Sequence, residues 1–265
     1  MLAVGLSLTA HLLAGLAASG AGTVNALAGG GSLISFPSLI GLGVPSVSAN
    51  VTNTLALCPG YFGGALAQRG DLAGQRRRVK SLLTAAAAGG LVGSVLLVIT
   101  SDELFRSIVP ALLIVACLLL LGQDRLKLWL GRRESAHALG VGIASDGAPS
   151  ALLLASVFSA AIYGGYFGAG LGIIVLAVLG LLINDELGRL NAVKQMISFA
   201  ANLAAASLFV FSGDVVWTLA LVMAPASLVG GALGGMLAGR LDAARLRTMV
   251  AGVGIALALI MVVRG

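Results

Sequence analysis

A lysine stands inside an apolar segment of this sequence, with polar side chains at helical spacing beside it. Lys194 lies five residues past Arg189, which is about 7.5 Å deeper along a helix. Asn191, Gln195 and Ser198 recur at intervals of three or four residues, so a helix aligns them in one stripe. An ammonium group flanked by amide and hydroxyl groups can bind a small anion.

An uncharged counterpart to this stripe lies in the first half of the chain. The segment "SANVTNT" carries Asn50, Asn53 and Thr54. If both groups face one site, Lys194 supplies the charge, and the amides and hydroxyls bond the oxygens of the anion. The alternative is that the long Lys194 side chain extends to the membrane interface and takes no part in binding.

Glycine clusters precede two short apolar runs and form the second part of the candidate site. Glycine permits sharp turns, and a helix that starts after such a turn points free N–H groups and a positive dipole end at the space before it. Such a helix end suits an anion. The alternative is that these glycines only allow helices to pack closely. The residues assigned here are Gly30, Gly31, Ser32, Gly170 and Gly172.

The residue pattern does not support catalytic chemistry. No His/Cys/Asp/Glu cluster has the spacing of metal ligands, no nucleophile stands with a base, and no Walker-type loop is present. We therefore expect no catalytic residue, no metal and no cofactor. The carboxylates lie in loops and fit a topological role, so a coupled proton has to travel on the substrate or on Lys194. Cys58 and Cys117 lie in apolar segments, and we expect no disulfide.

The composition indicates a lipid environment. Hydrophobic residues make up 58% of the 265 residues and charged residues only 10%, against about 25% charged residues in an ordinary soluble domain. The 38 glycines suit close helix packing in a bilayer. A formal net charge of +6 could suggest a nucleic-acid partner. The basic residues lie between apolar runs, however, so they indicate membrane topology, and we expect no nucleic acid.

Ten apolar runs predict an all-α membrane protein with about ten transmembrane or half-membrane helices. The strand alternation of a membrane barrel is not present in the sequence. Two of the runs are too short to cross the hydrocarbon core as helices. The runs are 2–27, 30–42, 47–67, 79–99, 104–122, 149–167, 170–183, 188–211, 214–238 and 244–263, of which 30–42 and 170–183 are the short ones.

Three basic loops predict the orientation of the chain. They are residues 68–80, 123–146 and 239–247, and the positive-inside rule places all three in the cytoplasm. Because the number of runs is even, the two termini lie on the same side of the membrane. With the basic loops in the cytoplasm, that side is the outside. An eight-span alternative, with both short runs as re-entrant loops, would export the 239–247 loop and is therefore less favoured. The predicted location is the cell (inner or plasma) membrane, which the chain crosses several times.

The two halves of the sequence resemble each other. The stretch "NALAGGGSLISFPSL" aligns with "GYFGAGLGIIVLAVL", and this alignment pairs Ala28 with Gly168. Further along, "SANVTNT" aligns with "RLNAVKQ", which pairs Asn50 with Asn191. Five runs in each half make the halves antiparallel, as in the inverted five-segment repeats of many secondary transporters. We divide the chain into a first repeat (1–122), a charged cytoplasmic linker (123–148) and a second repeat (149–265).

These motifs resemble those of the TauE/SafE family of sulfite exporters and related permeases. The glycine cluster before Pro37, followed by "SANVTN", is similar to the first-half signature of that family. The stretches "YFGAGLGI" and "LNAVKQMIS" are similar to its second-half counterparts. The resemblance covers nearly the whole chain, with Ala28 standing where a glycine is common.

The resemblance implies export or uptake of sulfite, organosulfonates or other small sulfur-containing or organic anions. We expect a secondary-active exporter that works by alternating access. A passive anion channel is the alternative, and a membrane-embedded enzyme is a less favoured one. Proton coupling and assembly into a homo-oligomer are both compatible with this interpretation.

Overall fold

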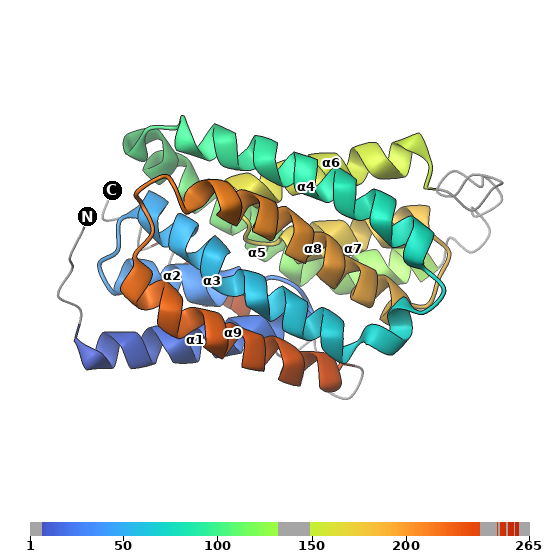
Figure 1. The fold of residues 1–265 in the computed structure, drawn as a ribbon, viewed down its shortest axis with the longest axis horizontal. Coiled ribbons are helices and arrows are strands. Elements are labelled where there is room, and N and C mark those ends of the chain that lie inside the picture. Colours follow the sequence, from blue (N-terminus) through green and yellow to red (C-terminus); the bar gives the residue numbers. More distant parts are fainter. Residues whose placement is uncertain are drawn as a thin grey trace.

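The structure, a computed structural model, describes residues 7–131 and 149–238 and several helical residues between 248 and 259. The first two ranges are almost entirely helical and contain no β-strand, which confirms the predicted all-α membrane fold (Figure 1). The helices are α1 (Leu8–Leu27), α2 (Ser32–Gly41), α3 (Ser46–Ala67), the short 3-10 helix η1 (Arg69–Leu72), α4 (Arg76–Val98), α5 (Asp102–Gly131), α6 (Ala151–Tyr166), α7 (Leu171–Leu182), α8 (Leu187–Phe209) and α9 (Trp217–Met236).

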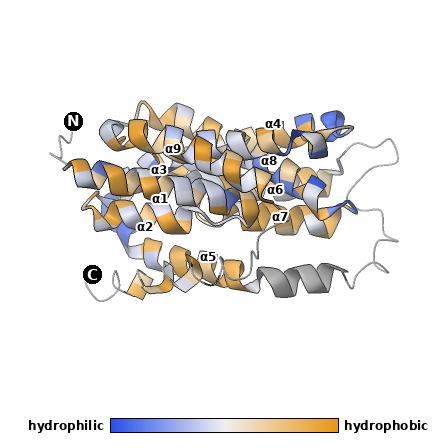
Figure 2. Cartoon of the chain, turned by 90° about the horizontal axis from the view of Figure 1, so that it is seen from below, coloured by the Kyte–Doolittle hydropathy of each residue, from blue (hydrophilic) through white to orange (hydrophobic). Residues whose placement is uncertain are grey.

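The first nine predicted runs each correspond to one α-helix, and the two short runs are the two shortest. Helix α2 has 10 residues and α7 has 12. Four helices (α4, α5, α8 and α9) are long and apolar enough to cross a membrane by the criteria of length and composition. Figure 2 shows hydrophobic residues along most of the helices and a hydrophilic group at one end of α4. Much of the predicted linker and of the last predicted run lies outside the described residues.

The two halves of the chain exchange their fourth helices. Helix α9 packs along α1 and α3, which are the first and third helices of the other half. Helix α4 packs in the same way along α6 and α8. The third helices, α3 and α8, meet each other between these two groups (Figure 1). This reciprocal packing is the arrangement expected of two inverted repeats.

Each half contains a break between its first and second helices, made by glycines in the left-handed region. The first break has Gly29 at φ 78° and Gly30 at φ 84°, and the second has Gly168 at φ 77° and Gly170 at φ 85°. A residue with a Cβ rarely adopts these backbone angles, so glycine at these positions permits the chain to turn.

The helix ends show which glycines are equivalent. The Gly29 N–H donates to the carbonyl five residues earlier, and the Gly168 N–H does the same, at N···O distances of 3.1 and 3.4 Å. Gly29 therefore occupies the position of Gly168, and the predicted pairing of Ala28 with Gly168 is wrong by one residue. Both breaks contain four residues, 28–31 and 167–170, so the offset between the halves at this point is 139 and not 140.

The two breaks touch each other in the interior. A Cβ atom added to Gly29 would lie 3.0 Å from the carbonyl carbon of Gly172 and 3.0 Å from the backbone nitrogen of Ile173. Both glycines are buried. Two glycine clusters that are about 140 residues apart in the sequence are thus packed backbone against backbone.

Replacing Gly29 by alanine should destabilise the protein by about 1–3 kcal/mol, because the residue needs a positive φ and has backbone at contact distance. Gly41, the last residue of α2, has open space around it and is the matched control. Gly41→Ala should leave the thermal midpoint in detergent unchanged or slightly raised. Equal midpoints for the two variants would show that the contact between the breaks is not tight.

Candidate functional site

Lys194 lies on α8 and is fully buried, with 0% of its surface exposed. Its Nζ donates a hydrogen bond of 2.8 Å to the backbone carbonyl of Asn25, in the last turn of α1. The carbonyl end of a helix carries partial negative charge, which favours an ammonium group there. The side chain therefore points to the interior of the protein and does not extend to the membrane interface.

Lys194 also lies beside the second glycine break. A Cβ atom on Gly172 would be 3.6 Å from Cδ of Lys194 and 3.2 Å from Cα of Gly29. The lysine stem thus passes the point where the two breaks meet. The structure brings the predicted charge and both predicted glycine clusters together.

Side chains hold the broken end of α1 in place. Asn191 donates from Nδ2 to the carbonyl of Ala26 at 3.0 Å and to Oε1 of Gln68 at 2.8 Å. Oδ1 of Asn25 accepts from the backbone N–H of Gly31 at 2.6 Å, across the break. Carbonyls and N–H groups that the helix break leaves without partners are thereby satisfied by side chains.

The remaining polar residues of the α8 stripe have unused hydrogen-bonding capacity. Gln195 and Ser198 are both fully buried. Neither the two amide atoms of Gln195 nor Oγ of Ser198 has a hydrogen-bond partner among the residues that the structure describes. A Cβ atom on Gly64 would collide with Nε2 of Gln195, so the glycine makes room for this amide. Unpaired buried polar atoms cost about 1–3 kcal/mol each, and a bound ligand or water offsets that cost.

The polar residues of the first half surround the second break instead. Asn50 donates from Nδ2 to the carbonyl of Tyr166 at 2.8 Å, at the end of α6. Thr54 lies beside Gly168, where a Cβ atom would be 3.9 Å from its Oγ1. Asn53 accepts a hydrogen bond of 2.5 Å from Oγ of Ser35. Asn50 and Thr54 therefore contact the end of α6 and the break that follows it, whereas Asn53 contacts α2 of its own half.

Several residues of this region were not predicted. Tyr61 is buried, and its hydroxyl group interacts with the side chains of Ser32 and Asn25. Asn25, Ser35 and Gln68 are buried as well. The signal that could have found them is the one that marked Lys194, a polar residue inside or at the end of an apolar run.

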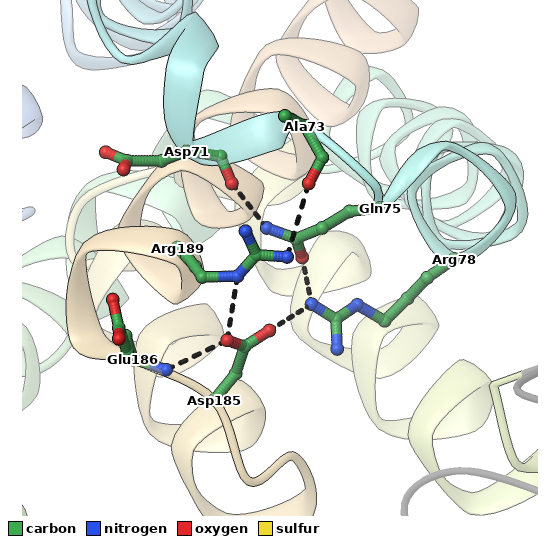
Figure 3. A network of polar contacts seen from close by, with 7 residues as sticks. All are labelled: Asp71, Ala73, Gln75, Arg78, Asp185, Glu186 and Arg189. Carbon is green, nitrogen blue, oxygen red and sulfur yellow. Dashed lines mark hydrogen bonds and ion pairs between the residues drawn. The ribbon is translucent and has the colours of Figure 1, made fainter.

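A charged network joins the two halves at one end of the bundle (Figure 3). Asp185, which precedes α8, accepts from Arg78 of α4 at 2.6 Å and from Nε of Arg189 at 2.9 Å. Its Oδ1 also accepts the backbone N–H of Glu186 at 2.9 Å. Arg189 in turn donates to the carbonyl of Ala73 at 3.3 Å, beside η1. Asp185 is one of the loop carboxylates for which the sequence predicted only a topological role. Its ion pair with Arg78 links the second half of the chain to the first.

The network lowers the pKa of the Asp185 carboxyl. Burial alone would raise the pKa of this carboxyl. The hydrogen bonds from Arg78 and from the backbone of Glu186, with the positive charges of Arg78 and Arg189, outweigh burial and hold the pKa of Asp185 below its ordinary value. Asp185 is therefore ionised at neutral pH.

Comparisons with known proteins identify a family and several relatives. Residues 13–261 match the family model described as "Sulfite exporter TauE/SafE". A "Probable membrane transporter protein ORF9" of Sinorhizobium sp is 29% identical over 94% of this chain and 92% of its own length. A "Probable membrane transporter protein" of Haemophilus influenzae is 28% identical over 80% of this chain and 78% of its own. The "Probable membrane transporter protein YfcA" of Escherichia coli K12 is 26% identical over 83% and 76%. No solved structure gives a significant match.

Asp185→Asn should lower the free energy of unfolding by about 1–3 kcal/mol at neutral pH, because it removes hydrogen bonds to a charged group. A lowered folded-state pKa stabilises the fold above the unfolded pKa of about 3.9, and this contribution is lost as the pH falls through the folded-state pKa. The gap between wild type and variant in thermal scans should therefore close from about pH 5 downward.

The exposed Glu103 provides the control for this experiment. Glu103→Gln should leave the thermal midpoint unchanged at every pH. A difference between wild type and Asp185→Asn that stays constant down to pH 3 would show that the carboxylate charge contributes nothing.

Proposed function

Since the chain belongs to the sulfite exporter TauE/SafE family and is a multi-pass membrane transporter, we propose that it is a secondary-active exporter of small anions. The substrates in question are sulfite, organosulfonates or related sulfur-containing or organic anions. The observation that carries the proposal is Lys194, a fully buried ammonium group inside a membrane helix and beside both glycine breaks.

The case for Lys194 as the counter-charge is electrostatic. A bare anion loses its hydration on entering a low-dielectric interior, and Born estimates of that cost reach tens of kcal/mol. A helix N-terminus contributes about 0.3–1 kcal/mol, and about 2 kcal/mol where it is partly buried. The ends of α2 and α7 are therefore too weak alone, and a full positive charge is needed. Lys194 is a charge of that kind at the point where these ends approach each other.

The neighbouring polar groups complete the proposed site. Gln195 and Ser198 have hydrogen-bonding atoms without protein partners among the described residues, and these can bond the oxygens of the substrate. In the structure Nζ of Lys194 bonds the Asn25 carbonyl, so a bound anion takes over part of this bond. The other proposed contacts are Gly30, Gly31, Ser32, Asn50, Asn53, Thr54, Gly170, Gly172 and Asn191, as predicted from the sequence.

Alternating access follows from the packing of the two halves. If residues 1–122 and 149–265 are inverted repeats, a movement that opens one end of the site has a counterpart, related by the pseudo-two-fold axis, that opens the other. The reciprocal packing of α4 and α9 supports this division. We place the end with Arg78, Asp185 and Arg189 in the cytoplasm by the positive-inside rule, and both termini outside.

Counterflow in proteoliposomes should show saturation and trans-stimulation by a single small anion, because a carrier exposes its site to one side at a time. The measurement is uptake of labelled sulfite at rising concentrations, with sulfite, a sulfonate or a carboxylate trapped inside. A passive channel would show neither saturation nor trans-stimulation. An imposed pH gradient in the same vesicles shows whether protons are coupled to the movement.

Lys194→Met should abolish binding of the anion that is preferred in counterflow, because methionine keeps the length of the side chain and removes its charge. Lys194→Arg should weaken binding less, although a planar guanidinium suits a compact site poorly. Isothermal titration in detergent measures both affinities.

The exposed Lys80 at the start of α4 is the matched control for loss of one positive charge. Lys80→Met should bind as tightly as wild type. Equal affinity of wild type and Lys194→Met would remove the lysine from the site, and the site would then depend on backbone amides and neutral side chains.

A further inference from the structure

Two asparagines at equivalent positions donate hydrogen bonds in opposite directions across the halves, each to the last turn of a broken helix. Asn50, the fifth residue of α3, donates to the carbonyl of Tyr166 at the end of α6, at 2.8 Å. Asn191, the fifth residue of α8, donates to the carbonyl of Ala26 near the end of α1, at 3.0 Å. Each asparagine thus holds the broken helix of the half to which it does not belong.

The orientation of both amides is fixed by these bonds. A backbone carbonyl only accepts, so each side chain must turn its Nδ2 toward the helix end. Oδ1 of both asparagines is then left buried and without a partner among the described residues. The two side chains are 1% and 8% exposed, so water at the surface does not solvate these oxygens. Each of the two asparagines therefore has a buried acceptor, Oδ1, without a hydrogen bond. A second orientation of the side chain can bring that oxygen to a donor.

The two bonds lie at opposite ends of the α3–α8 pair. Asn191 also donates to Gln68, which directly follows α3, so the start of α8 lies by the end of α3. Asn50 is therefore at the other end. There a cavity of about 150 Å³ is lined by Val47 and Val51, which flank Asn50, and by Asp102 and Asp214.

Lys194 shares the turn that Asn191 holds. Its Nζ bonds the carbonyl of Asn25, and Asn191 bonds the next carbonyl along, that of Ala26. An anion that draws Nζ away from Asn25 thereby loosens the turn on which the Asn191 bond depends. Binding of an anion and the hydrogen bonds that hold the end of α1 are thus linked through the adjacent carbonyl groups of Asn25 and Ala26.

We propose that Asn50 and Asn191 are positioning residues that close the pathway at its two ends, a role that rests on the proposed alternating access. The Asn191 bond closes the end with Arg78 and Asp185, and the Asn50 bond closes the end with the cavity. Because each bond crosses between the halves, its release frees the glycine break of the opposite half. One bond can open while the other holds, which is what alternating access needs.

Hydrogen exchange of the full-length protein in nanodiscs, without any anion, tests this arrangement. Asn→Leu keeps the branching and the number of side-chain heavy atoms, removes the donor and suits a membrane interior. Asn191→Leu should raise exchange roughly two- to tenfold in residues 24–31, the range that loss of one net hydrogen bond gives, and leave 163–170 unchanged. Asn50→Leu should raise exchange in 163–170 and leave 24–31 unchanged. The effect of each substitution appears in the other half of the chain.

Asn202 is the matched control. It is 3% exposed, and its Nδ2 bonds the carbonyl of Ser198 within its own helix. Asn202→Leu should change neither segment. If a leucine variant does not fold, serine at the same position removes the long donor and keeps a polar group.

The outcomes distinguish failure of this proposal from failure of the proposed substrate class. Faster exchange in the half that carries the substitution, in both segments equally, or in neither would overturn the roles of Asn50 and Asn191. The crossed pattern together with no counterflow of any anion would leave those roles standing and remove the proposed substrate class. Normal counterflow in both leucine variants would show that the bonds do not control access.

Discussion

Two helices end inside the apolar interior, and their last carbonyl groups need partners that lipid cannot supply. The structure meets this constraint with side chains from the opposite half. Lys194 and Asn191 bond the end of α1, and Asn50 bonds the end of α6. The third helices therefore lie beside the two breaks, and each fourth helix packs along the first and third helices of the opposite half. The polar centre is a consequence of breaking two helices in the buried interior, and its groups are those of the proposed anion site.

The two ends of the bundle are closed by different chemistry. At one end, Asp185 sits between Arg78 and a second arginine, so an approaching anion meets positive charge. At the other end, Asp102 and Asp214 line the cavity beside Asn50, and in the interior the ring of Phe167 packs edge-on against Phe36 and Phe105, with ring centroids 5.4 and 6.2 Å apart. Positive charge attracts an anion and is weakened by salt, whereas packed aromatic rings do neither. The carboxylates at the other end repel an anion, so the two ends act on an approaching anion with opposite sign, and salt weakens both effects.

The elements could be predicted from the sequence because hydrophobic runs and their lengths are local properties of the chain. Lys194 was found for the same reason, since a charge inside an apolar run is visible without any structure. Its partner Asn25 was not found, because the contact joins residues 169 positions apart. The register of the two breaks was predicted one residue out because glycine-rich segments align almost equally well in two registers. Asp185 was interpreted as topological because its role depends on an arginine in the other half, 107 positions away.

The polar stripe of α8 also bears on how this chain is made. Among the four helices that are apolar enough to span a membrane, α8 is the least apolar and the most buried. Asn191 and Lys194 bond the end of α1, and Gln195 rests in the space left by Gly64 of α3. Alone in lipid, α8 would expose these groups to hydrocarbon. Because a ribosome releases the first half before the second, α1 and α3 are in the bilayer when α8 emerges. The chain order thus supplies the partners before the segment that needs them, and the second half by itself would insert poorly.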